Sequence, residues 1–216
     1  MKTINNYILS KIKNETNITE KLKINKSTLN RLTLVPITRG ELVEMIKKEI
    51  KQNGNECDLN HIDVSKLTNL HNLFWNEETM EFNGDISQLD VSNVKDMTNM
   101  FRDSNFDGDI SEWNVSNVEI MTCMFDGASF DGDLSGWDVS NVDDMSYMFD
   151  NSMYSGKNGS ISKWDVSNVR NMNKMFRNSD FNQDISNWQI LSYCSTTDMF
   201  DDCPIKNNYR PKCLQI

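Results

Sequence analysis

Apolar residues recur along the chain at spacings that change within each unit of the pattern. In one unit, apolar and polar residues alternate at Trp113 and Val115, which is typical of a short strand with one buried face. The next apolar residues, Met121, Met124 and Phe125, are three or one apart, which favours a helical or 3₁₀ turn. The pattern therefore predicts a strand, a turn, a short helical segment and a second turn in every unit.

The same pattern returns several times, so the chain is built from repeats. The sequence Asp-Val-Ser-Asn-Val occurs at residues 90–94, 138–142 and 165–169, with variants at 63–67 and 114–118. Units start near residues 63, 90, 114, 138, 165 and 189. One unit alone cannot bury its apolar face, but stacked units bury it against each other.

These observations predict an α/β-type repeat solenoid: a leucine-rich-repeat-like, right-handed stack of about six coils. The spacing Ile-x-x-Trp-x-Val-x-x-Val is that of the leucine-rich repeat. We assign residues 1–56 to an N-terminal helical and basic cap with a linker. Residues 57–216 are assigned to the solenoid, including a C-terminal cap at 201–216.

Two helices are predicted before the repeats. Thr38 and Glu41 form a capping box, and the apolar residues that follow predict a helix over about 39–52 that covers the first coil. Ile4, Ile8 and Ile12 share one face of a second helix within residues 1–14, either a further cap or a docking helix for another chain. The Asn-, Thr- and Lys-rich residues 14–30 are predicted to be a linker.

The repeat motifs resemble those of a known family. Asp-Val-Ser-Asn-Val-x-x-Met-x-x-Met-Phe, followed by Phe-x-Gly-Asp-Ile-Ser-x-Trp, is similar to the repeats of the BspA-like leucine-rich repeat proteins of bacteria. The resemblance covers residues 63–200. It implies a solenoid that is used for binding, often on bacterial surfaces and in adhesion.

Charge divides the chain into two parts. The whole chain has a formal net charge of −10. Residues 1–56 carry 11 basic and 6 acidic side chains, whereas residues 57–216 carry 11 and 26. Nucleic acid and anionic membranes repel so acidic a surface, so we expect a protein partner that is itself basic. Neither a run of about 18 apolar residues nor an apolar signal segment is visible, so we expect no membrane insertion and a cytoplasmic location, with the cell surface as the alternative.

A polar stripe is the candidate binding surface. Polar residues that flank the predicted strands are expected on the concave side of the stack. An acidic stripe there attracts a basic partner, although Asp and Ser side chains also commonly bond to the backbone of their own turns. The predicted partner-binding residues are Asp63, Asp90, Glu112, Asn114, Asp138, Lys163, Asp165 and Gln189.

Catalytic chemistry is not indicated, and we expect no enzyme, cofactor or metal. No nucleophile, phosphate-loop or dinucleotide motif is present, and the Asp-Gly-Asp sequences favour turns over a calcium loop. Cys194, Cys203 and Cys213 could form a disulfide or metal cluster, but their spacing matches no ligand set.

The sequence therefore predicts a non-enzymatic protein–protein interaction module. Two alternatives are an exported bacterial surface adhesin or virulence-type protein that binds host proteins, and a phage or mobile-element accessory or inhibitor protein.

Overall fold

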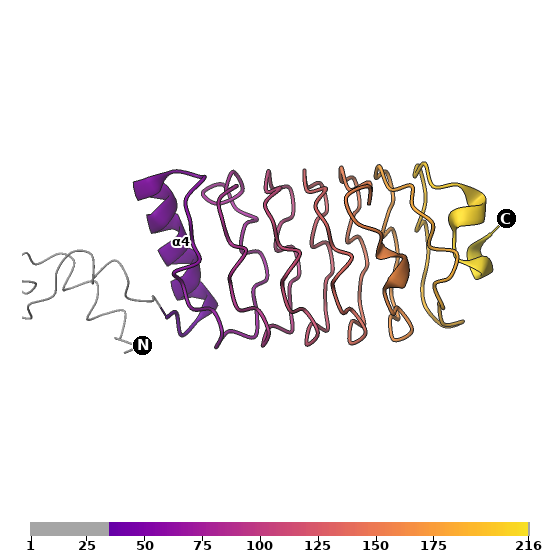
Figure 1. Ribbon diagram of the computed structural model, residues 1–216, viewed down its shortest axis with the longest axis horizontal. Coiled ribbons are helices and arrows are strands. Elements are labelled where there is room, and N and C mark those ends of the chain that lie inside the picture. Colours follow the sequence, from indigo (N-terminus) through magenta and orange to yellow (C-terminus); the bar gives the residue numbers. More distant parts are fainter. Residues whose placement is uncertain (1–34, 216) are drawn as a thin grey trace, which may run out of the picture.

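The computed structural model describes residues 35–215 as a row of coils that lie side by side along the long axis of the molecule (Figure 1). The element order is α4 (Arg39–Asn53), η1 (Ile161–Lys163), η2 (Asn207–Tyr209) and η3 (Lys212–Leu214), the last three being 3₁₀ helices. The helix and linker predicted within residues 1–30 lie outside the described residues. No helix in the described part of the chain has the length and apolar character that a membrane crossing requires.

The predicted α/β-type leucine-rich-repeat solenoid is wrong. Between residues 35 and 215 there is no strand and no sheet, and none of the coils carries an α-helix. Backbone pairing between coils is limited to isolated parallel bridges, which join positions 69, 96, 120, 144, 171 and 195. These bridges lie after the segment in which the strands were predicted.

Local hydrogen bonds explain why that segment is not extended. Trp113 N–H donates to Ile110 O at 3.2 Å, and Val118 N–H donates to Val115 O at 2.9 Å. Between these two turns, Asn114 Oδ1 accepts from the N–H of the serine two residues on. The alternation of apolar and polar residues therefore reflects consecutive turns, because Asn, Asp and Ser side chains compete with strand pairing.

The coils pair instead along their Met- and Phe-containing parts, which we call the Met-Phe segments. In the second coil, the N–H groups of Met97, Asn99 and Phe101 donate to carbonyls of the following coil at 2.9–3.0 Å. Asn99 has a φ of 53°, which keeps the backbone out of the strand conformation. The six Met-Phe segments are residues 70–76, 97–103, 121–127, 145–151, 172–178 and 196–202.

The interior is a column of like side chains, as the periodicity predicts. Neighbouring Phe rings of successive coils stack with centroids 5.3–5.9 Å apart. Four buried Trp side chains each donate from Nε1 to a carbonyl of the preceding coil at 3.0–3.1 Å. The Phe column is Phe74, Phe101, Phe125, Phe149, Phe176 and Phe200, and the Trp residues are Trp113, Trp137, Trp164 and Trp188.

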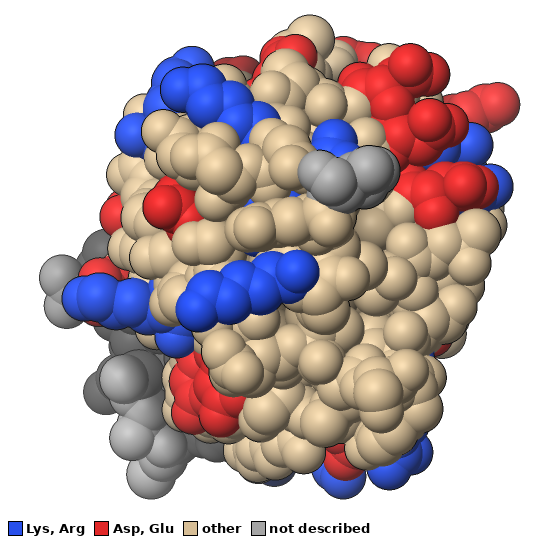
Figure 2. Space-filling view, turned by 90° about the vertical axis from the view of Figure 1, so that its right-hand side faces the viewer, with Lys and Arg blue, Asp and Glu red and all other residues tan. Residues whose placement is uncertain are grey.

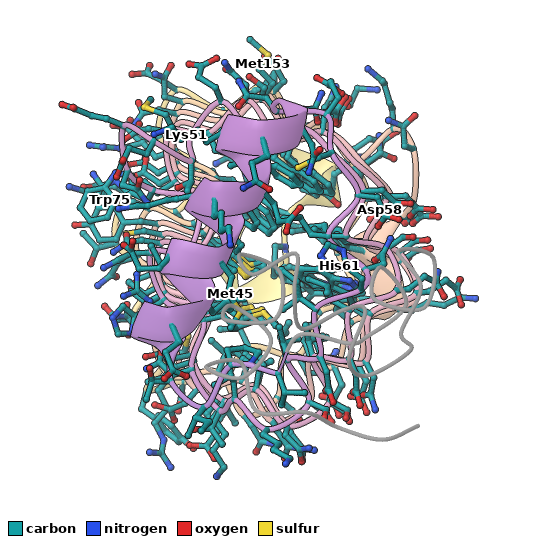
Figure 3. The ribbon with its side chains drawn as sticks, turned by 90° about the vertical axis from the view of Figure 1, so that its left-hand side faces the viewer. Met45, Lys51, Asp58, His61, Trp75 and Met153 are labelled. Atoms are coloured by element: carbon teal, nitrogen blue, oxygen red, sulfur yellow. The ribbon has the colours of Figure 1, made fainter. Side chains whose placement is uncertain are left out.

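The first coil is covered by α4 (Figure 3). The predicted helix is confirmed: Thr38 Oγ1 accepts from Glu41 N–H, and Leu42 and Ile46 are each 1% exposed against the coil. Gly54, with a φ of 85°, ends the helix. This cap buries apolar surface that the end of a repeat stack otherwise exposes.

Candidate functional site

The predicted stripe lies on turns, not on a concave strand face. Asp90 Oδ1 accepts from the N–H of Ser92 at 3.1 Å and from its hydroxyl at 2.6 Å. Asp138 makes the same two bonds to Ser140. We call these turns, at residues 63–65, 90–92, 114–116, 138–140 and 165–167, the corner turns.

The other stripe residues follow the same local logic. Hydrogen bonds from Ser167 lower the pKa of Asp165, and Gln189 Nε2 donates to a backbone carbonyl two residues earlier. Glu112 and Lys163 are exposed. One oxygen of each corner carboxylate or amide is thus occupied by its own turn. Partner binding by these residues remains a prediction.

Stacking of the corner turns is provided by asparagine. Asn117 Nδ2 donates to Ser92 O, and Asn141 Nδ2 donates to Ser116 O, both at 2.7 Å. The same bond recurs at Asn93 and Asn168. The nearly constant sequence of the corner turns is therefore explained by local folding and by contacts between coils.

The Met-Phe segments carry residues that differ from coil to coil. Viewed from the N-terminal end, Trp75 in the first segment lies on the opposite side of the stack from His61, which precedes the first corner turn by two residues (Figure 3). The position directly after the Phe of each segment changes in size and charge along the stack. Its occupants are Trp75, Arg102, Asp126, Asp150, Arg177 and Asp201.

Four of these residues form two ion pairs in successive coils. Arg177 Nε and Nη2 donate to the two carboxylate oxygens of Asp150 at 2.8 and 2.6 Å. Arg102 Nη2 lies 3.2 Å from Asp126 Oδ2. Asp150 is 2% exposed and Asp126 is 7% exposed, so both carboxylates are almost fully removed from water. A buried carboxylate requires such a partner.

The two buried carboxylates are not electrostatically equivalent to surface ones. Burial raises the pKa of Asp126, and the neighbouring charge of Asp150 adds to the rise while Arg102 opposes it. Burial also raises the pKa of the Cys123 thiol to about 11, so that this cysteine is a neutral thiol at pH 7.

An open groove of about 550 Å³ lies over these residues. The third coil places two small residues there, Cys123 and Gly127, where the flanking coils carry the larger Tyr147 and Asp103. Gly127 has a φ of 67°, and a Cβ at this position would lie 2.4 Å from Asp103 Oδ1. The groove is therefore a notch produced by a local departure from the repeat.

Aromatic and guanidinium groups border the groove. Arg102 lies over the ring of Trp75, 5.1 Å from its centroid, and Trp75 Nε1 donates to Asp103 Oδ2 at 3.3 Å. Trp75 remains 39% exposed. The buried Nε of Arg102 has no hydrogen-bond partner among the described residues. This side chain could therefore donate a hydrogen bond to an incoming acceptor.

Sequence reasoning missed this groove because it followed the residues that recur. The signal that could have located it is the opposite one: the position after each Phe is where the repeat is least regular. Other candidates give weaker sites. His61 Nε2 lies 3.7 Å from Glu49 Oε1, Cys194, Cys203 and Cys213 are free thiols, and no group of three potential metal ligands occurs among residues 35–215.

Comparison with known proteins gives one family. The model of the family described as Mycoplasma protein of unknown function, DUF285, matches residues 41–157 and 151–209. No curated protein matches the chain, and no solved structure matches it.

Proposed function

The chain belongs to the family described as Mycoplasma protein of unknown function, DUF285, whose members are repeat proteins of bacterial origin, and we propose that it is a non-enzymatic module that binds a protein partner through the groove of its Met-Phe segments. The observation that carries the proposal is the contrast between positions. Residues that recur in every coil are used in the core or in their own turns. Residues that change from coil to coil border the groove.

The chemistry of the groove fits a protein surface. An exposed Trp75, a guanidinium with an unused donor and three carboxylates offer apolar contact, hydrogen bonds and charge within one open area. Trp, Tyr and Arg are the residues that contribute most to protein–protein binding. The net charge of −15 over residues 57–216 favours a partner with basic side chains.

Two variants test the groove against the corner turns. Tyr147→Asn introduces the residue found at the same position of the first and second coils, Asn72 and Asn99, which also have positive φ. Asp138→Asn introduces the residue found at the equivalent corner, Asn114. Each substitution is thus one that this fold already accommodates.

Tagged chains are used to capture partners from a lysate of the cells that produce the protein, with mass-spectrometric quantification. We expect Tyr147→Asn and Trp75→Ala to reduce capture of the specific partner at least tenfold, and Asp138→Asn to leave it unchanged. A partner retained by both groove variants contradicts the proposal. If the lysine substitutions at Asp90, Asp138 and Asp165 abolish capture instead, the corner stripe is the binding surface.

A second candidate function is surface adhesion, favoured by the resemblance of residues 63–200 to BspA-like repeats. It requires export of the chain. Fractionation of cells that produce the tagged chain decides between the two locations: accumulation at the cell surface or in the medium supports an adhesin, and retention in the cytoplasm contradicts it.

A further inference from the structure

The last Met-Phe segment ends the stack with unused hydrogen-bond donors. In each of the first five segments, alternate N–H groups donate to carbonyls of the next coil, so the donors of every segment point toward the C-terminal end. The sixth segment has no coil after it. Within residues 35–215, no hydrogen bond is made by the corresponding N–H groups, which are those of Thr196, Asp198, Phe200 and Asp202.

A hollow of about 420 Å³ adjoins this edge. It is lined by Thr196, Asp198 and Phe200 and by Arg210 and Leu214 of the C-terminal tail. Arg210 lies over the Phe200 ring, 5.2 Å from its centroid, and its buried Nε has no hydrogen-bond partner in the described chain. The end of the stack therefore offers a row of donors whose natural complement is a row of backbone carbonyls.

We propose that residues 4–8 of the chain bind this edge as an additional rung of the ladder. The sequence Ile4-Asn5-Asn6-Tyr7-Ile8 has the apolar-x-Asn-apolar-apolar pattern of residues 70–74 and 97–101. In those two segments the Asn has a positive φ of 53–54°. Asn tolerates this region better than most residues, so Asn6 suits the same position.

Charge favours the same assignment. Residues 1–34 carry seven basic and two acidic side chains. The edge carries three acidic side chains: Asp198 and Asp201, which line the hollow, and the adjacent Asp202. Figure 2 shows this end of the molecule as a largely uncharged surface that a few basic side chains cross, with acidic residues gathered at one margin. A basic segment is therefore attracted to the margin, and its apolar residues meet the uncharged surface.

The length of the chain permits binding within one molecule. The roughly 30 residues between the proposed rung and α4 span up to about 100 Å when extended, whereas six coils at about 4.8 Å each occupy about 29 Å. A tethered segment within reach has an effective concentration in the millimolar range, which exceeds that of a second copy at micromolar protein. The occupant is therefore the chain's own segment.

Amide hydrogen exchange in the full-length protein tests the proposal. We expect the Thr196, Asp198 and Phe200 amides to exchange at least tenfold more slowly in the native chain than in Tyr7→Asp or Ile8→Asp. Leu29→Asp, in the same part of the chain but outside the rung, is the matched control and should retain the native rates. Slow exchange at Met97 and Phe101 in every variant confirms that the coils remain folded.

Equal exchange at the edge in the native chain and in Tyr7→Asp overturns the proposal. Dilution from about 100 to 1 μM identifies the source of the segment. Unchanged protection supports binding within one chain. Protection that disappears on dilution, together with a smaller hydrodynamic size, assigns the rung to a second copy and overturns the intramolecular arrangement.

Discussion

The corner turns and the Met-Phe segments of the same coils use their polar residues in opposite ways. At the corners, each Asp or Asn bonds to the serine two residues on, and each inter-coil Asn bonds to a backbone carbonyl. After the Phe of the Met-Phe segments, charged residues bond instead to side chains of neighbouring coils, as Arg177 does to Asp150. Local bonds permit the same residue in every coil, whereas bonds between coils require different residues in successive coils.

This difference predicts where a single substitution is most costly. Arg177→Met should destabilise the fold by about 3–5 kcal/mol, because it leaves the almost fully buried Asp150 without its charge partner. Urea unfolding at pH 7 measures the loss. The matched control is Arg170→Met, which removes an ion pair with Asp143 in which both side chains are more than half exposed. It should cost at most about 1 kcal/mol. Equal losses in the two variants would show that the groove pair has no special role in stability.

At the corners we expect a smaller effect that depends on the replacement. Asp138→Ala removes the acceptor of the Ser140 N–H and hydroxyl bonds and should cost about 1 kcal/mol. Asp138→Asn keeps an acceptor oxygen, as Asn114 does, and should be close to neutral. Thermal unfolding of the two variants separates these outcomes. Should both be equally destabilised, the corner carboxylate has a role beyond its turn.

The smallest effect expected is the pH dependence contributed by Asp126. Burial raises the pKa of Asp126 above its usual value of 3.8, so the folded protein binds a proton more tightly than the unfolded chain does. The associated stability is present below about pH 4 and is lost as the pH rises through the folded pKa. Asp126→Asn should therefore reduce the loss of stability between pH 4 and 7 in urea titrations, whereas Asp103→Asn, at an exposed neighbour, should not. A variant with an unchanged pH profile would contradict the assignment.

The sequence reveals the repeat and its interior because both depend on residue type at fixed spacing. The Met, Phe and Trp columns are buried, and α4 begins at the capping box, since a capping bond and an apolar periodicity act over a few residues. The strand prediction failed for a related reason. Alternation at Trp113 and Val115 is compatible with a strand or with two consecutive turns, and only the hydrogen bonds made by Asn114 and its neighbours distinguish them.

The groove could not be inferred from the repeat, although each of its residues is visible in the sequence. Asp126 and Asp150 lie 24 residues apart, and nothing in their immediate neighbours indicates that one pairs with Arg102 and the other with Arg177. Their burial depends on how neighbouring coils stack.

The sequence by itself determined the unit length, the buried columns and the helix that covers the first coil. Each of these follows from apolar spacing or from a bond between residues close in the chain. Only the tertiary structure decided that the coils pair through left-handed positions of the Met-Phe segments, that two small residues open a groove in the third coil, and that the last coil presents unused donors. These features arise from contacts between residues a whole coil apart, whose relative placement is set when the coils stack.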